Sequence, residues 1–257
     1  MITATILGCG GATGVPSISS GWGACNPLNP KNRRRRPSIL VDSCGMRLLV
    51  DTSPDLREQL LDAGVRHLDA VIYTHSHADH VHGIDDLREV NRAMGGPLAL
   101  HAAADVLEAI SQRFPYVLGE VAEGQTIYKP MLLPHEVTGP FAVGDVCVTP
   151  FTQDHGYGST LGLRFGPLAY STDVVNLDEA AFETLAGIDT WIVGCLTDYA
   201  HPTHADVDKV LQWVDRLRPR RTVLTHMSTR LDYDALKARL PAHIEPAHDG
   251  MIIEVTQ

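Results

Sequence analysis

Three histidines and one aspartate are clustered within six residues, His75-Ser76-His77-Ala78-Asp79-His80. Imidazole suits zinc, manganese or iron, and a carboxylate adds negative charge and can hold or bridge a second ion. The cluster follows an apolar run at 68–73 that is typical of a buried strand, and a helix is expected from about Ile84. Ligands on the loop that leaves a strand are what a hydrolytic site with two metal ions needs. The alternative, a surface loop that is rich in histidine by chance, explains less of this pattern.

Six residues cannot complete the coordination of two ions, so further ligands must come from other parts of the chain. Three candidates each follow a short β-prone run: His155 after 148–154, Asp173 after 168–172, and His226 after 222–225. Taken alone, a histidine or aspartate at the end of a strand is more often a cap or a surface residue. Their number and their order after the histidine cluster favour a metal site.

The elements that must position these residues are indicated by apolar runs. Strands are expected at 3–7, 38–42 and 47–50, before the histidine cluster, and short strands dominate the middle of the chain. From Ala169 the order returns to alternating strands and helices. This repetition in two parts predicts two mixed sheets that lie face to face, with helices outside and the ligand-bearing loops gathered along one edge.

Two helices are indicated by their caps and apolar spacing. The first is predicted to have Ser53 as its N-cap, Pro54 at its first position and Gly64 as its stop, with an apolar face made of Leu56, Leu60 and Leu61. The second covers 206–217, and its apolar residues recur at helical spacing: Val207, Val210, Leu211, Val214 and Leu217. This stripe predicts core packing and not a cofactor site.

Four further motifs extend the pattern over nearly the whole chain. They are the glycine-rich opening at 8–16 (GCGGATGVP), Arg35-Arg36-Pro37-Ser38 before a strand, Leu224-Thr225-His226, and Asp249-Gly250-Met251 near the end. With the order of the ligand candidates, they resemble the metallo-β-lactamase superfamily. Within it the chain is similar to the PhnP-type cyclic phosphodiesterases and, more distantly, to tRNase Z. The resemblance implies an α/β fold, a four-layer αββα sandwich of two mixed β-sheets flanked by helices.

The resemblance also implies a ligand set for two divalent ions, zinc or manganese, with iron as a further option. One ion would be held by His75, His77 and His155, and the other by Asp79, His80 and His226, with Asp173 bridging both. Asp79 thereby counts as a catalytic residue as well. Divalent ions lower the pKa of bound water toward about 7, which suits hydrolysis of a phosphodiester. Because β-lactamases proper often use a thiolate where this chain has Asp173, hydrolysis of β-lactams is not expected.

A leaving alkoxide needs a proton, and the resemblance implies that His204 donates it. His204 lies in His201-Pro202-Thr203-His204-Ala205-Asp206, directly before the second predicted helix. The alternatives are that His204 is merely exposed or that His201 acts in its place. Asp206 would either orient His204 or stabilise the start of the helix.

Two aspartates are candidates for orienting the ligands from behind. Asp51 closes the strand at 47–50, and Asp249 lies in the near-terminal motif. A metal-bound histidine usually donates its other ring N–H to a carboxylate or a carbonyl, so each could accept such a bond. The alternative is that either aspartate is only a turn residue.

The remaining glycine and arginine motifs allow two interpretations each. Gly8, Gly10, Gly11 and Gly14 lack the Gly-Lys-Ser/Thr of a Walker A motif, so we expect them to let the backbone approach the metal loop closely. The basic run at 31–36, which includes Arg33 to Arg36, is either a solvated turn or a source of arginines for the substrate phosphate.

The chain departs from its relatives at a separate, structural zinc site that some of them carry. Some PhnP-type enzymes carry a structural zinc held by a cysteine cluster after the opening motif and by a histidine three residues past the last metal histidine. This chain has only Cys25 in that loop, and Thr229 replaces the histidine. We therefore expect no structural zinc, and the phosphoribosyl cyclic phosphate specificity of those enzymes need not carry over.

Composition narrows the class of protein. The chain has 257 residues and no linker, which predicts a single domain over 1–257. A net charge of −10 argues against broad binding of nucleic acid, and no apolar run is long enough to span a membrane. The start of the chain lacks the basic region of a signal peptide, and five scattered cysteines form no disulfide pattern, which suits the cytoplasm. The expected partner is a small phosphodiester, with homodimerisation as an option.

The leading hypothesis is therefore a dinuclear phosphodiesterase that acts on a small cyclic or nucleotide-like phosphodiester. The main alternative is an RNA 3′-processing endonuclease like tRNase Z, although the chain shows no insertion that resembles the long tRNA-gripping arm of that enzyme. A thioesterase or a lactonase of the same fold stays open because ligands do not determine the scissile bond. A non-catalytic metal-binding protein would not need His204.

Overall fold

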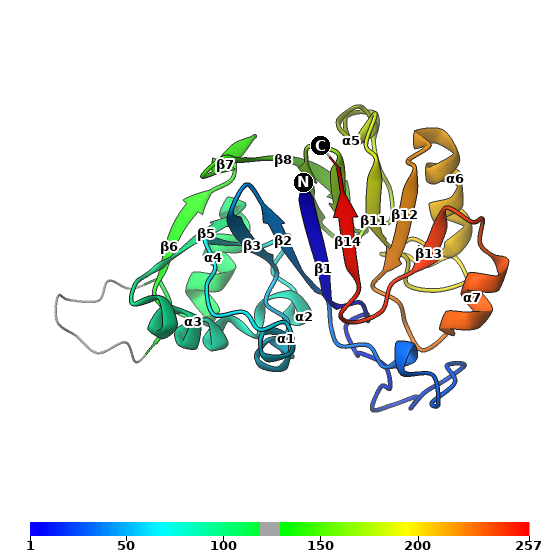
Figure 1. Cartoon of the computed structure of the whole chain (residues 1–257), viewed down its shortest axis with the longest axis horizontal. Helices are drawn as coiled ribbons and strands as arrows, with labels where there is room; N and C mark the ends of the chain where they lie inside the picture. The colour runs from blue at the N-terminus through cyan, green and yellow to red at the C-terminus, as the bar shows by residue number, and fades with distance from the viewer. Residues whose placement is uncertain (119–128, 257) are drawn as a thin grey trace.

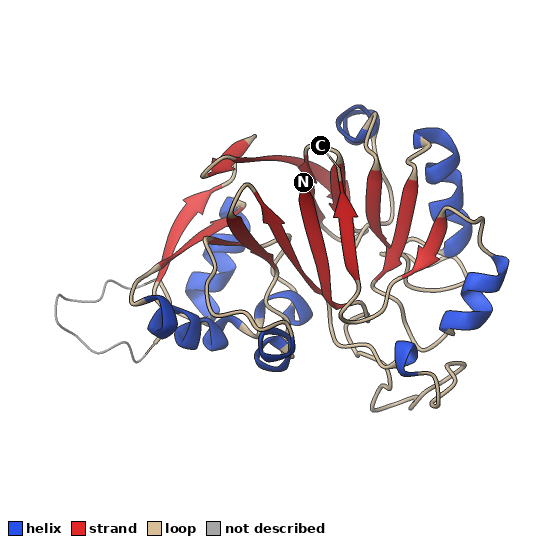
Figure 2. Cartoon of the chain, viewed as in Figure 1, coloured by secondary structure: helices blue, strands red, loops and turns tan. Residues whose placement is uncertain are grey.

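The computed structural model describes residues 1–118 and 129–256, and its strands form two mixed sheets that pack face to face (Figures 1 and 2). In the first sheet the strand order is β14-β1-β2-β3-β4-β5-β6. Its strands are β1 (Ile2–Gly8), β2 (Ser38–Ser43), β3 (Met46–Val50), β4 (Ala70–Ile72), β5 (Leu98–Ala102), β6 (Leu132–Glu136) and β14 (Ile252–Val255). Pairing is antiparallel from β14 to β3 and parallel from β3 to β6.

The second sheet repeats this arrangement, with the order β13-β12-β11-β10-β9-β8-β7. Its strands are β7 (Phe141–Val143), β8 (Val146–Asp154), β9 (Ser159–Phe165), β10 (Leu168–Ser171), β11 (Thr190–Gly194), β12 (Arg221–Thr225) and β13 (Ile244–Pro246). Pairing is antiparallel from β7 to β10 and parallel from β10 to β13. The predicted pair of mixed sheets is confirmed.

Helices cover the outer faces of the two sheets. They are α1 (Leu56–Asp62), α2 (Ala78–Val81), α3 (Leu87–Met94), α4 (Ala104–Arg113), α5 (Glu179–Leu185), α6 (Val207–Leu217) and α7 (Tyr233–Arg239), with short 3-10 turns at Pro30–Asn32 and Ile84–Asp86. Side chains of a strand alternate between its faces, and β3 shows the consequence. Leu48 and Val50 join the core between the sheets, while Leu49 packs with the helices α1–α4. The four-layer αββα sandwich is therefore present.

The two predicted helices occur, but the start of the first one was predicted wrongly. Helix α1 begins at Leu56, and the Ser53 hydroxyl accepts a bond from the Asp55 backbone N–H instead of capping the helix (3.1 Å). Leu61 is 61% exposed and does not belong to the apolar face. Gly64 follows the helix with φ +64°, as its role as a stop requires.

The apolar stripe of α6 packs against the core, as predicted. Asp206 is the N-cap of this helix, and its carboxylate accepts from the Lys209 N–H at 2.9 Å. Asp206 was predicted either to orient His204 or to stabilise the start of this helix, and the structure shows the second role. After the histidine cluster, a 3-10 turn occupies Ile84–Asp86, so α3 begins at Leu87, three residues later than expected.

The opening glycines pack mostly against the arginine run and not against the metal loop. A Cβ atom on Gly8 would lie 2.0 Å from the Arg36 carbonyl oxygen, and one on Gly10 would lie 2.9 Å from that of Arg35. Only Gly11 approaches His226, where a Cβ would lie 3.5 Å from Cε1. Gly11 thus lies near one ligand candidate, but none of the nearest contacts of these four glycines is with the loop at 75–80, where a close approach was expected.

The interpretation of the run as a solvated turn holds in part, because Lys31 and Arg33 are exposed while Arg34 is buried. None of Arg33 to Arg36 lines the cavity over the metal-ligand candidates, so the second interpretation, arginines for the substrate phosphate, was wrong. Arg34 is 2% exposed and donates to the carbonyls of Leu231 (2.6 Å) and Ser228 (3.1 Å), just beyond His226. The guanidinium groups of Arg35 and Arg36 form ion pairs with Asp62 and Asp55, both at 2.6 Å. Arg33 lies over the ring of Trp22.

Cys25 lies beside the buried guanidinium of Arg34, with 4.0 Å between Sγ and Nη1. Its thiol also contacts the carbonyls of Leu231 (3.5 Å) and Thr229 (3.6 Å). Cys25 belongs to neither of the groups of described residues that could hold a metal ion. The absence of a structural zinc and the single-domain organisation stay predictions. No helix in the described part of the chain is long and apolar enough to cross a membrane.

Gly83 offers a test of how tightly the loop behind the histidine cluster is packed. A Cβ atom there would lie 2.0 Å from the Ser53 carbonyl oxygen, whereas one on Gly96 would meet nothing within 4 Å. Because backbone must move, Gly83→Ala should lower the free energy of unfolding by about 1–3 kcal/mol or more. The control Gly96→Ala should change it by less than about 1 kcal/mol. Denaturant titration measures both, and equal effects would contradict this packing.

Candidate metal centre

The seven predicted ligands come together at one edge of the sandwich, where strands of both sheets end. His75 and His77 follow β4, and Asp79 and His80 lie in α2. The other three, His155, Asp173 and His226, follow β8, β10 and β12. Because β4, β10 and β12 each belong to a parallel part of a sheet, their carboxyl ends deliver side chains to a shared edge, where α/β proteins commonly bind ligands.

Ligand atoms converge in two groups that share Asp173. The first group is His75, His77, His155 and Asp173, and the second is Asp79, His80, Asp173 and His226. Within each group the ligand atoms all lie within 4.8 Å of one another. His77 is exposed and the other six residues are buried. This is the grouping that the resemblance implied.

The two carboxylate oxygens of Asp173 face different groups. Oδ2 lies 3.5 Å from Nε2 of His75 and 3.7 Å from Nε2 of His155. Oδ1 lies 3.3 Å from Nε2 of His80 and 3.0 Å from Nε2 of His226. A carboxylate in this position can contribute one oxygen to each of two ions.

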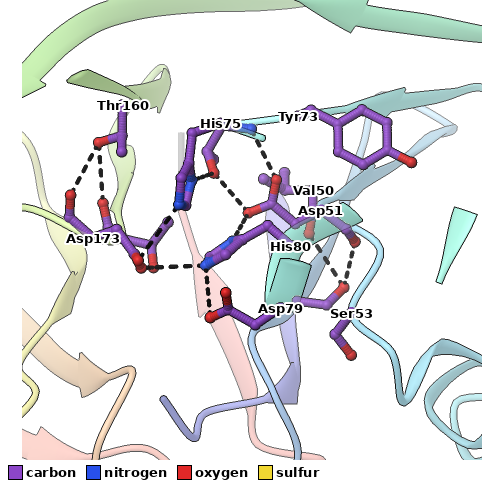
Figure 3. A network of polar contacts seen from close by, with 12 residues as sticks. Val50, Asp51, Ser53, Tyr73, His75, Asp79, His80, Thr160 and Asp173 are labelled. Carbon is purple, nitrogen blue, oxygen red and sulfur yellow. Dashed lines mark hydrogen bonds and ion pairs between the residues drawn. The ribbon is translucent and has the colours of Figure 1, made fainter. Parts of the chain in front are cut away.

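Buried imidazole nitrogens without a partner indicate that this donor set fits divalent ions. Nε2 of His75 and Nε2 of His80 are buried, and neither has a hydrogen-bond partner among the described residues. In Figure 3, Nε2 of His75 points toward the carboxylate of Asp173, and Nε2 of His80 points toward that of Asp79. An orphaned polar atom is costly in a protein interior, and one metal ion in each group would satisfy these nitrogens. Imidazole and carboxylate together suit zinc, manganese or iron.

Asp51 contacts the nitrogen of His80 that faces away from Asp173, which is the contact that its predicted orienting role requires. Its Oδ2 lies 2.6 Å from Nδ1 of His80, and both side chains are fully buried (Figure 3). The same carboxylate accepts from the backbone N–H and the hydroxyl of Thr74, each at 2.8 Å, and that hydroxyl lies 3.0 Å from Nδ1 of His75. Asp51 therefore holds His80 directly and His75 through Thr74.

Asp249 does not contact the ligands, so the role expected for it was wrong. Its carboxylate accepts from the backbone N–H of Arg35 (2.7 Å) and from the N–H and thiol of Cys9 (3.1 and 3.3 Å). Burial raises the pKa of Asp249 to about 6 despite these bonds. Asp249 joins the end of β1 to the arginine run. The sequence motif could not show which backbone N–H groups would donate to its carboxylate.

Three residues of the site have left-handed backbone conformations. The φ angles are +62° at Asp51, +48° at Asp173 and +55° at His226. Such angles are uncommon outside glycine, and strain of this kind concentrates at functional sites. In each case the residue follows a strand, so the sharp turn directs the side chain into the edge of the sandwich.

The two groups of imidazoles differ in the direction of their pKa shifts. Burial lowers the pKa of His75 and lowers that of His155 to about 4. Burial also opposes charge on His80 and His226, but Asp173 and the neighbouring carboxylates outweigh it and raise the pKa of His226 to about 9. If His80 or His226 is an imidazolium, its proton on the coordinating nitrogen must leave when an ion binds, so metal affinity at that group should fall with falling pH.

His204 lies at the centre and His201 lies farther out. Nε2 of His204 is 3.3 Å from Oδ2 of Asp173, and its ring stacks on that of His226 with 5.1 Å between centroids. Because an ionised carboxylate can only accept, the contact with Asp173 favours the tautomer of His204 with its proton on Nε2, and the Thr203 hydroxyl, 2.8 Å from Nδ1, can then donate to that nitrogen. Burial lowers the pKa of His204. His204 therefore contacts Asp173 and His226 and also lines the cavity over the site.

Several residues around the metal-ligand candidates were not predicted from the sequence. The carbonyl of Thr203 lies 2.7 Å from Nδ1 of His155, which orients that ring. A cavity of about 330 Å³ opens over the site, and its walls include Asp105, Val106 and Tyr157. A glycine on each side of Tyr157 marked a turn, but nothing local indicated that the turn would lie over the ligands.

Asp51→Asn tests the orienting role. Asparagine tolerates the left-handed backbone at position 51, but its single acceptor oxygen cannot replace both carboxylate oxygens, which together accept from the His80 ring, the Thr74 hydroxyl and the Thr74 N–H. We expect a 10- to 100-fold loss of zinc affinity, the range typical of such outer contacts, measured by competition with a chromophoric chelator. Asp62→Asn, which removes only the surface pair with Arg35, is the control. Unchanged zinc affinity in Asp51→Asn would rule out this role.

Comparisons with known proteins agree on the family. A family model described as "Beta-lactamase superfamily domain" matches residues 46–227, well over half of the chain. A solved structure described as a new diphosphatase from the PhnP family is 33% identical, has a TM-score of 0.91, and is matched over 100% of this chain and 98% of that one. Human tRNase Z, short form, is 16% identical with a TM-score of 0.69 over 99% and 100% of the two chains, and shares the fold alone.

Curated relatives are longer than the segments that match. An octanoyltransferase of Porphyromonas gingivalis is 34% identical over 252 residues, which are 96% of this chain and 50% of that protein. A ribonuclease Z of Bradyrhizobium diazoefficiens is 33% identical over 113 residues, 38% of each chain. The matches thus span about half or less of these relatives. With the family model, the PhnP-family neighbour and the shared fold, they establish that this chain belongs to the metallo-β-lactamase superfamily, in its PhnP-like group.

Proposed function

We propose that the chain is a dinuclear metal-dependent hydrolase that cleaves a phosphodiester or diphosphate linkage in a small molecule. The observation that carries the proposal is the position of Asp173, whose two oxygens face two separate groups of ligand atoms. The similar PhnP-family structure is described as a diphosphatase, which supports phosphorus–oxygen chemistry. Zinc or manganese is the proposed metal, with iron as an option, and a PqqB structure of the same fold is described as zinc-bound.

Two divalent ions, when bound, would supply an activated water and neutralise charge on the phosphoryl oxygens. The residues of the chain position these components. Asp51 and the Thr203 carbonyl fix the rings of His80 and His155, so the ligands are preorganised. His204, with its proton on Nε2 beside Asp173, would donate that proton to the leaving oxygen. His75, Asp173 and His204 all line the cavity in which a substrate would lie.

RNA processing is the second function to consider because relatives named ribonuclease Z match part of the chain. A net charge of −10 and a cavity of about 330 Å³ favour a small substrate over tRNA. A lactonase or a thioesterase would use the same ions on a carbonyl group. These functions differ in the scissile bond and not in the ligands.

A substrate panel separates these functions. The zinc- or manganese-loaded protein should hydrolyse bis(p-nitrophenyl) phosphate and at least one of a nucleoside 2′,3′-cyclic phosphate, ribose 1,2-cyclic phosphate and a dinucleoside diphosphate. It should leave precursor tRNA, an acyl thioester and a lactone intact. Turnover of the lactone or thioester alone, or cleavage of precursor tRNA in preference to the small diesters, would contradict the proposal.

His204→Ala tests the proton donor. Positioned general acids contribute about 10²–10⁴-fold, so turnover on diesters with poor alkoxide leaving groups should fall by that range. With p-nitrophenolate, which hardly needs a proton, the loss should be much smaller. Metal content and thermal stability should stay near those of the parent. Equal losses on both substrate types would assign His204 to substrate positioning, and His201→Ala is the matched variant that should have little effect.

A further inference from the structure

Tyr157 is the one large aromatic side chain that the described residues place on the wall of the metal-site cavity. It lies in the turn between β8 and β9, two residues after the ligand candidate His155, and it is 92% exposed. A single exposed aromatic is common on protein surfaces and needs no function by itself. Tyr157 differs because its turn is fixed to the site.

The turn that carries Tyr157 is held at both ends. The backbone N–H of His155 donates to the Gly158 carbonyl (2.9 Å), and that of Tyr157 donates to the His155 carbonyl (3.0 Å). Gly156 has φ +80°, and a Cβ atom on it would lie 2.5 Å from the Pro202 carbonyl oxygen. The turn is therefore packed against the segment that also orients His155 and carries His204. Tyr157 is therefore a cavity-wall residue whose backbone is already ordered, so a contact with substrate would cost little further entropy there.

The described residues of the cavity wall include no cationic side chain with which to bind a second phosphate. None of the described lining residues is a lysine or an arginine, and Asp105 adds a carboxylate from the first turn of α4. Residues 119–128, which lie outside the described part, contain no lysine or arginine in the sequence. The guanidinium of Arg113 donates to the carbonyl of Ser76, which is itself a lining residue.

We infer that Tyr157 determines specificity by stacking on a planar ring of the substrate, which is a nucleoside-type compound without a further phosphate. The inference rests on the proposed function, because the ions would hold the scissile phosphorus group. Stacking of a base on an aromatic side chain is worth about 1–3 kcal/mol, which corresponds to roughly 5- to 150-fold in binding. Asp105 repels a distal phosphate and is placed to accept hydrogen bonds from sugar hydroxyls. This specificity differs from that of a phosphoribosyl cyclic phosphate hydrolase.

A pair of substrates that differ only in the base tests the inference. Adenosine 2′,3′-cyclic phosphate and methyl ribofuranoside 2,3-cyclic phosphate should differ by about 5- to 150-fold in kcat/KM, mainly through KM. Tyr157→Ala should remove this difference by lowering kcat/KM for the adenosine compound alone, and Tyr157→Phe should keep it. Equal losses on both compounds in Tyr157→Ala, or an unchanged preference, would overturn the stacking role.

A distal phosphate and a binding measurement complete the test. Adding a 5′-phosphate to the adenosine compound should lower kcat/KM, and Asp105→Asn should recover part of the loss. A gain in kcat/KM from the 5′-phosphate would overturn the charge argument.

If the parent hydrolyses no diester, the proposed function fails, but calorimetry still tests Tyr157. Adenosine 5′-monophosphate should then bind the metal-loaded parent and Tyr157→Phe more tightly than Tyr157→Ala, whereas ribose 5-phosphate should not distinguish them. Equal binding of adenosine 5′-monophosphate to all three proteins would overturn the inference.

Discussion

The carboxylate of Asp173 lies between two groups of histidines, 3.5 Å from His75 on one side and 3.0 Å from His226 on the other. Asp173 is 2% exposed, and a charge so deeply buried is costly unless it is compensated. Burial opposes ionisation, but His226 and His80 hold the pKa of Asp173 well below its usual range. Two divalent ions would provide stronger compensation, and the rest of the edge is arranged around this one side chain.

The scaffold directs several side chains to the same place by ending strands there with strained turns. Asp51, Asp173 and His226 have left-handed backbone conformations, and a conformation of this kind persists only where the surroundings enforce it. The buried bond between Asp51 and His80 and the packing of Gly83 against Ser53 provide such surroundings. The contacts behind the ligand candidates therefore contribute to the stability of the fold and also hold the ligands in position. The opposite side, at the cavity, is open to substrate.

Local patterns sufficed to predict the fold and the positions that converge. The histidine cluster and the strand-end residues could be identified because a motif and a short apolar run are both local features. The structure brings all seven together, and their role as ligands stays a proposal. Asp249 and Arg34 were misjudged because burial and partner choice depend on distant segments: Arg34 bonds to Leu231, 197 residues away. Tyr157 and Asp105 could not be identified, since only the tertiary fold places them on one cavity.

Anomalous diffraction from crystals of the protein loaded with zinc or manganese would show whether Asp173 lies between two ions. We expect two anomalous peaks per chain, one among His75, His77 and His155 and the other among Asp79, His80 and His226. One oxygen of Asp173 should coordinate each ion. A single peak, a peak that Asp173 does not contact, or an ion held at Cys25 in place of this edge would show that the site is not a dinuclear centre bridged by Asp173.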